Sequence, residues 1–225
     1  KPTYGRISRY GLIAYASSFD QIGIFSTTVT DAAITLEVIA GADEYDSTVS
    51  PKEVSSYSAQ LVINKKFRFA YFDEALNHPG LDSEIGNSIK KRIEQLKNEG
   101  HIVSPVKFEL LDYIVPAYYV LTTAEASSNL SRFDGVKYGY RTSAPGVELT
   151  DFYKKTRSAG FGKEVKRRIM LGTFVLSAGY YDAYFTRAQK VRQLLCSKTA
   201  EILQSYDFIM MPTSPVTAFK AGEKM

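Results

Sequence analysis

Cysteine and histidine are scarce in this sequence of 225 residues, which contains one cysteine and two histidines. A single cysteine, Cys196, excludes a disulfide framework within the chain and fits a reducing compartment, so we expect a cytoplasmic protein. Neither His78 nor His101 has a plausible nucleophile beside it, which leaves no Ser-His-Asp or Cys-His arrangement. We expect both histidines to lie in solvated turns. Three scattered His and Cys residues also predict no metal site.

Long apolar runs and a phosphate-binding loop are missing as well. The longest apolar stretches, such as 208–211, are too short to span a bilayer, so we expect no membrane partner. The glycines of 135–146 lack the Lys-Ser/Thr pair of a nucleotide-binding loop, so we predict no cofactor in this chain. The net charge of +4, from 28 basic and 24 acidic residues, is too small and too evenly spread to indicate a nucleic-acid surface.

Hydrophobic periodicity predicts an α/β protein with a mixed sheet flanked by helices. A helix at 82–98 lies between strands at 67–72 and 102–110, and this order is typical of a strand–helix–strand unit. Thr28 or Thr30 caps a helix that begins at 31. Further helices are expected at 113–132 with Pro116 in the first turn, at 150–158, and at 162–205 as a pair that meets near 178–179. Strands are expected at 11–16 and, as the best buried candidate, at 207–211.

Arg168 is an unusual residue for its position. On a helix it shares a stripe with apolar or small residues, namely Phe161, Val165, Gly172, Val175 and Leu176. A guanidinium on such a stripe must find an anion or bend outward to water. Gly172, one turn further on, leaves space for a ligand or a backbone. Three interpretations therefore stay open: outward solvation, a structural ion pair, and ligand binding.

Tyr118 is a weaker case of the same kind. It lies on a mixed stripe with Ile114, Leu121, Glu125 and Ser128, where a core tyrosine with a satisfied hydroxyl is the alternative to a site residue. The small polar residues 127–129 allow close approach of another chain, or simply tight packing within this one.

Several long strings in the sequence resemble the amidase signature family. They are KPTYGR at 1–6, SRYG at 8–11 and ASSFDQIG at 16–23. Others resemble the glutamine-hydrolysing subunits of tRNA-dependent amidotransferases more than generic amidases: EASSNLSRFDG at 125–135, GFGKEVKRRI at 160–169 and GYYDAY at 179–184. The string MPTSP at 211–215 fits a strand exit of the amidase signature family. The resemblance covers nearly the whole chain and is weakest across 51–110.

The resemblance implies a large sheet between helices and a Ser–cis-Ser–Lys triad, which works without histidine. All three triad residues of the family lie upstream of the string that begins at Lys1, so we assign no catalytic residue here. We expect 1–225 to be a single domain, an interior and C-terminal-side part of a larger amidase signature domain truncated at both ends. The alternative is a processed but complete small protein.

The resemblance also implies a function. Such a subunit releases ammonia from glutamine, and a partner subunit uses ATP and Mg²⁺ to amidate glutamate or aspartate misacylated on tRNA. A small third subunit bridges the two, and the tRNA contacts lie mainly on the partner. In the glutamine-hydrolysing subunit, Tyr118 contacts glutamine and Arg168 binds its α-carboxylate. A stand-alone amidase for small amides and a non-catalytic interaction fragment are the alternatives.

Overall fold

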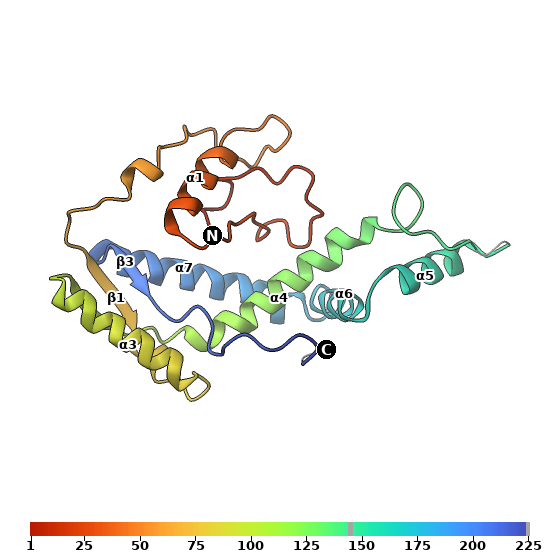
Figure 1. Cartoon of the computed structure of the whole chain (residues 1–225). Helices are drawn as coiled ribbons and strands as arrows, with labels where there is room; N and C mark the ends of the chain where they lie inside the picture. The colour runs from red at the N-terminus through yellow and green to blue at the C-terminus, as the bar shows by residue number, and fades with distance from the viewer. Residues whose placement is uncertain (144–145, 224–225) are drawn as a thin grey trace. The chain divides into compact units, whose positions relative to one another are not determined.

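The computed structural model describes residues 1–143 and 146–223, which form two compact units. The first unit comprises Lys1–Ile63 and Tyr118–Ala188, and the second comprises Asn64–Ala117 and Gln189–Met225. Figure 1 shows the elements of both along the chain. Each unit is described by itself below.

The second unit contains a three-stranded sheet with the order β2-β1-β3. Its strands are β1 (Arg68–Phe72), β2 (Ile102–Val106) and β3 (Phe208–Met210), and β1 pairs in parallel with both neighbours. The parallel pairing follows from the chain path, because α3 (Ser83–Asn98) connects β1 to β2 as a crossover helix. The short helix α2 (Asp73–Leu76) precedes it. The predicted α/β class is confirmed, and all three strands of this sheet are parallel.

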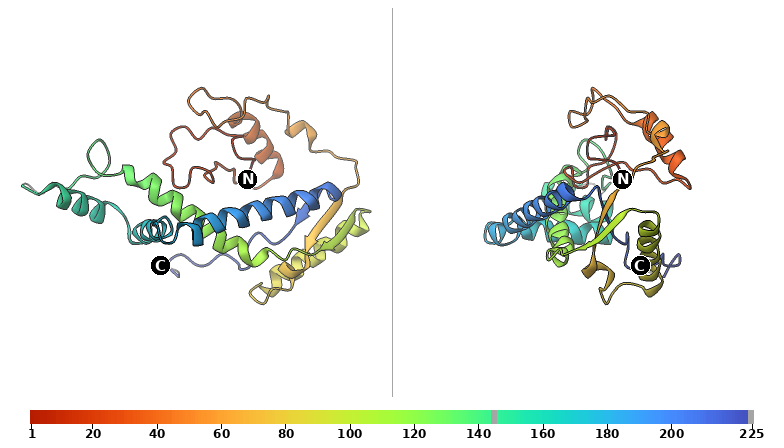
Figure 2. Two further views of the ribbon diagram at one scale, coloured as in Figure 1. Left: turned by 180° about the vertical axis from the view of Figure 1, so that it is seen from behind. Right: turned by 90° about the vertical axis from the view of Figure 1, so that its left-hand side faces the viewer.

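Two apolar clusters cover the two faces of the sheet, because side chains alternate along β1. On one face, Ala70 and Phe72 pack with Phe108 and with Ile202 of α7 (Arg187–Ser205). On the other, Phe69 and Tyr71 pack against a cluster formed mainly by α3 and β2, which consists of Leu76, Ile93, Leu96 and Val103. Figure 2 shows α3 and α7 on either side of the strands. The sheet is therefore flanked by helices, as the sequence predicts.

The regular secondary structure of the first unit is helical, and long loops join its helices. Its elements are α1 (Val29–Ile39), η1 (Ser58–Gln60), the larger part of α4 (Leu111–Asn129), η2 (Leu130–Arg132), α5 (Leu149–Gly160), α6 (Lys163–Val175) and a π-helical turn, η3 (Asp182–Thr186). Thr28, one of the two predicted caps, caps α1 by accepting the Asp31 N–H. The break between α6 and α7 lies where the sequence predicts it.

The helices α4 and α6 cross closely at Gly172. A Cβ atom on Gly172 would lie 1.9 Å from the carbonyl oxygen of Thr123, so only glycine fits against this backbone. Beside the crossing, the hydroxyls of Ser127 and Thr173 are hydrogen-bonded at 2.9 Å. The space that the sequence assigns to Gly172 is thus filled by the backbone of α4, and Ser127 serves packing within the chain.

Several local predictions are wrong. Pro116 lies in the second turn of α4, because this helix begins at Leu111. Residues 11–16 form no strand: a turn at Gly11 is followed by an irregular stretch at 12–14 and a bend at 15–16. Strand β3 is shorter than predicted and is not buried, since it is an edge strand of the described sheet and Phe208 is 47% exposed. His101 is largely covered: its Nδ1 accepts the Phe67 N–H at 3.0 Å and its ring stacks on the Phe67 ring.

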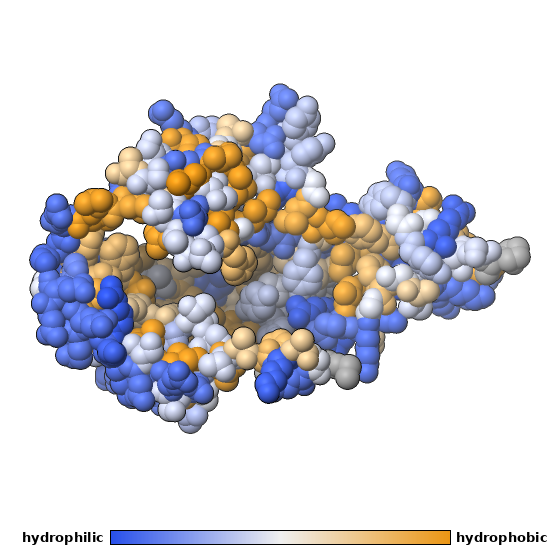
Figure 3. All heavy atoms as spheres, in the orientation of Figure 1, coloured by the Kyte–Doolittle hydropathy of each residue, from blue (hydrophilic) through white to orange (hydrophobic). Residues whose placement is uncertain are grey.

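Apolar side chains are exposed on α1. They are Val29, Ile34, Val38 and Ile39, and hydrophobic residues gather over this part of the surface in Figure 3. Only Ala33 of this helix is buried. The helix therefore presents an apolar surface that no described residue covers. None of the described helices is long and apolar enough to cross a membrane.

Candidate functional site

Arg168 lies in the middle of α6 and makes two hydrogen bonds through different parts of its guanidinium. Its Nε donates to Glu164 Oε1 at 2.9 Å, one turn earlier on the same helix. Its Nη1 donates to the hydroxyl of Tyr15 at 2.9 Å. Among the described residues, no hydrogen bond is made by Nη2. The side chain as a whole is 30% exposed.

Two aromatic rings lie next to this guanidinium. Its central carbon is 5.6 Å from the ring centroid of Tyr15 and 6.0 Å from that of Tyr119 on α4, distances at which a cation–π attraction operates. The hydrogen bond to Tyr15, followed by that to Glu164, raises the pKa of Arg168, and the neighbouring arginines Arg167 and Arg168 lower the pKa of Glu164. Arg168 therefore stays positively charged, and among the described residues its Nη2 makes no hydrogen bond.

Tyr118 lies next to Tyr119 on α4. Its ring packs edge-on against Tyr119, with centroids 5.5 Å apart, and against Phe19 at 6.3 Å. The side chain is 44% exposed, so it is not the buried core tyrosine of the alternative interpretation. The structure thus brings Arg168 together with Tyr119 and Tyr15, and Tyr118 joins this group through Tyr119.

The loop that carries Tyr15 is fixed to α4 by polar contacts. Asn129 donates from Nδ2 to the Tyr15 carbonyl at 3.2 Å and to the Ser17 hydroxyl at 2.9 Å. Glu125 accepts the Ser18 N–H at 2.9 Å and also its hydroxyl. These contacts join positions more than 100 residues apart. The EASSN part of the 125–135 string therefore binds the loop that contains the ASSFD part of the 16–23 string.

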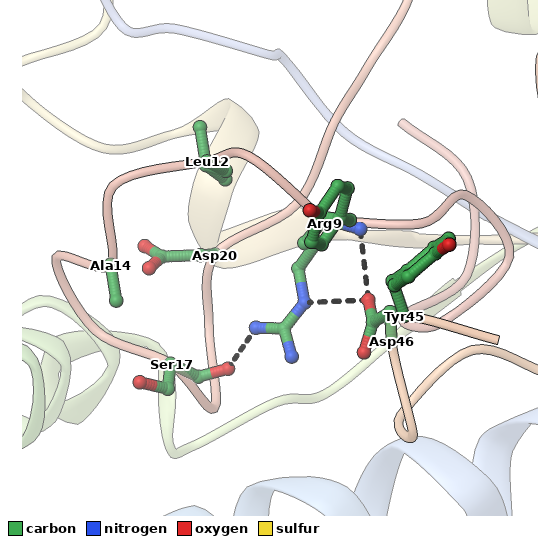
Figure 4. Close-up of a pocket in the computed structure, with 8 residues that line it drawn as sticks. Arg9, Leu12, Ala14, Ser17, Asp20, Tyr45 and Asp46 are labelled. Carbon is green, nitrogen blue, oxygen red and sulfur yellow. Dashed lines mark hydrogen bonds and ion pairs between the residues drawn. The ribbon is translucent and has the colours of Figure 1, made fainter. Parts of the chain in front are cut away.

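A second charged group lies in the same unit, at a cavity of about 190 Å³. Figure 4 shows Arg9 reaching between Asp46 and the main chain at Ser17. Asp46 accepts the hydroxyl of Thr48 at 2.6 Å and the N–H groups of Thr48 and Arg9, and these bonds lower the pKa of Asp46 to about 2. The Arg9 Nε is 3.8 Å from this carboxylate. We interpret the pair as structural, because Arg9 and Asp46 tie the N-terminal loops together.

Within residues 1–143 and 146–223, no cluster of three or more His, Cys, Asp or Glu side chains is arranged to hold a metal ion. His78 is exposed and its Nδ1 accepts the Gly80 N–H at 3.0 Å, as expected of a turn.

Comparison with known proteins decides the family. The amidase family profile matches residues 1–225, the whole chain. The chain belongs to the amidase family. It is 50% identical over 231 residues to the A subunit of glutamyl-tRNA(Gln) amidotransferase from Prosthecochloris aestuarii, covering 100% of this chain and 47% of that protein. It is 51% identical over 230 residues to the protein of the same name from Fusobacterium nucleatum, covering 99% and 46%.

A solved structure gives the same result. The crystal structure of the glutamyl-tRNA(Gln) amidotransferase A subunit from Thermotoga maritima matches with a TM-score of 0.70 at 39% identity, over 99% of this chain and 43% of that one. The amidase fold expected from the resemblance is therefore confirmed. The chain spans about half the length of the curated relatives that it matches.

Proposed function

We propose that this amidase-family chain is part of the glutamine-hydrolysing subunit of a tRNA-dependent amidotransferase. The overall reaction adds water across the side-chain amide of glutamine, so that the C–N bond breaks and glutamate and ammonia are formed. A partner subunit then uses ATP, Mg²⁺ and this ammonia to amidate glutamate or aspartate misacylated on tRNA, and a small third subunit bridges the two. The tRNA binds mainly to the partner, and the complex works in the cytoplasm.

The substrate assignment rests on the guanidinium of Arg168, which keeps hydrogen-bond donors that no described residue uses. A guanidinium offers five N–H donors in a planar fork, and two neighbouring donors match the two oxygens of a carboxylate. Glu164 and Tyr15 take one donor each. The unused donors are those that an α-carboxylate needs, and lysine would not reproduce their geometry. In this proposal Tyr118 contacts the rest of the glutamine molecule.

The relatives named above support the same proposal, because about half of the aligned residues are identical in proteins called amidotransferase subunits. The triad that breaks the amide bond is expected outside this chain, so the chain contributes substrate binding and packing. A stand-alone amidase for small amides is the second candidate. The ordered, partly unused arginine favours an amino-acid substrate over a simple amide.

The experiment that tests this function is tRNA amidation by the complete complex. The full-length protein, expressed with its two partner subunits, should convert misacylated tRNA to the amidated form when glutamine and ATP are supplied. Either glutamate or aspartate on the tRNA counts as substrate. A protein that hydrolyses small amides but gives no glutamine-dependent amidation would instead be a stand-alone amidase.

A further inference from the structure

Tyr15 stands out among the neighbours of Arg168 because it makes two kinds of contact with the same guanidinium. Its hydroxyl accepts a hydrogen bond from Nη1 at 2.9 Å, while its ring centroid lies 5.6 Å from the guanidinium carbon. The two residues are 153 positions apart in the sequence. The arginine side chain has several rotatable bonds, so two simultaneous contacts with one residue restrict the position and the orientation of its guanidinium.

Groups other than Arg168 hold Tyr15 in place. Its N–H donates to Asp20 Oδ2 at 2.8 Å, and its carbonyl accepts from Asn129 Nδ2 at 3.2 Å. The next residue, Ala16, is fully buried and also donates its N–H to Asp20. The main chain of Tyr15 is therefore held by the loop and by α4, through contacts that do not involve Arg168.

Arg168 is fixed from the helix side as well. It lies one turn before Gly172, where α6 touches the α4 backbone at Thr123. Tyr119, one turn before Thr123 on α4, places its ring 6.0 Å from the guanidinium carbon. The hydroxyl of Thr123 donates to the Tyr119 carbonyl at 2.6 Å, so its hydrogen bond is made within α4. The guanidinium of Arg168 thus lies within cation–π distance of one ring from the loop and one ring from α4.

We propose that Tyr15 is a positioning residue that orients Arg168 for a ligand carboxylate, a role that rests on the proposed function above. The Tyr15 hydroxyl occupies one N–H of Nη1, and Glu164 occupies the Nε N–H. The other N–H of Nη1 and both on Nη2 stay available to two carboxylate oxygens side by side. Tyr15 does not touch the substrate in this scheme; it determines which end of Arg168 the substrate meets.

The test uses Tyr15→Phe in the complete complex, since this change removes the hydroxyl and keeps the ring. The KM for glutamine should rise about five- to tenfold, the loss expected when a partly exposed hydrogen bond to a charged group is removed. The kcat, and amidation fed with free ammonia, should stay within about twofold. Tyr184→Phe is the matched control, because its ring packs on Phe174 and Tyr180 and among the described residues its hydroxyl makes no hydrogen bond; this variant should leave the KM for glutamine unchanged.

A double-mutant cycle separates positioning from a merely structural role. If Tyr15 acts through Arg168, then Tyr15→Phe should add nothing to the KM of Arg168→Ala. The inference is overturned if Tyr15→Phe leaves KM unchanged, if it slows the ammonia-fed reaction as much as the glutamine-fed one, or if its effect is fully additive. A wild-type complex that uses no glutamine would instead overturn the proposed function, and the inference with it.

Discussion

The substitution Gly172→Ala should destabilise the protein more than any other single methyl group added to α6. The new Cβ atom would lie 1.9 Å from the Thr123 carbonyl oxygen, 2.6 Å from its carbonyl carbon and 2.7 Å from the Ser127 Cβ. Ordinary contacts between such atoms are longer than 3 Å, so α4 and α6 would have to separate. Backbone atoms cannot rotate away as a flexible side chain can.

The magnitude has two parts. Overpacking of a tight contact costs about 1–3 kcal/mol, and a backbone clash belongs at the upper end. Separation of the helices would also lengthen the hydrogen bond of 2.9 Å between Ser127 and Thr173, which contributes about 1 kcal/mol. Together these give roughly 3–4 kcal/mol of lost unfolding free energy.

The assay is urea denaturation of the full-length protein, followed by far-ultraviolet circular dichroism. Gly179→Ala is the matched control, because nothing lies within 4 Å of its added Cβ and its φ is not in the left-handed region. The control should change the unfolding free energy by less than about 1 kcal/mol. If Gly172→Ala proved as stable as Gly179→Ala, the close crossing of α4 and α6 would be wrong.

Three further outcomes are expected. The 225-residue chain alone should hydrolyse no amide, because the expected triad lies outside it; glutaminase activity above that of a mock purification would contradict this. The isolated chain should self-associate in size-exclusion chromatography, because Val29, Val38 and other apolar side chains are exposed; a monodisperse monomer would argue against that. The pKa of Asp46 is lowered to about 2, so its carboxylate should stabilise the fold above about pH 4 and lose this contribution between about pH 4 and 2. The unfolding free energies of wild type and Asp46→Asn should therefore converge at acid pH, and a difference between them that persists at about pH 2 would refute this reasoning.

The helices were predictable where their signals are local. Asp82 caps α3 through the N–H groups of Glu84 and Ile85, and the apolar stripe behind it marks the buried face, so the element could be found within one stretch of sequence. Thr28 and α1 follow the same logic. The predicted strand at 11–16 is wrong because the side chain of Asp20 accepts the Tyr15 N–H, a donor that a strand would offer to a neighbouring strand.

The site was predictable only in part. The stripe on α6 distinguishes Arg168 from Arg167, and the two side chains do differ in exposure, at 30% and 76%. No local pattern could find Tyr15, because its contact with Arg168 joins two distant segments. Tyr119 was missed for a different reason: it adjoins Tyr118, and sequence alone does not say which ring faces the guanidinium. The sequence indicates that Gly172 leaves space for a ligand or a backbone, and the structure shows that the α4 backbone fills it.

The most direct test of the account compares Arg168→Ala with Arg167→Ala in the complete complex. Both arginines pair with Glu164, but among the described residues only Arg168 also donates a hydrogen bond to Tyr15. Removal of one partner of a charge pair costs about 2–5 kcal/mol, and the partial exposure of Arg168 favours the lower figure, a roughly 30-fold rise in the glutamine KM. Arg167→Ala should leave this KM within about twofold, and both variants should amidate tRNA normally with free ammonia. Unchanged glutamine use in Arg168→Ala, or an equal loss of the ammonia-fed reaction, would make Arg168 a structural residue and contradict the account.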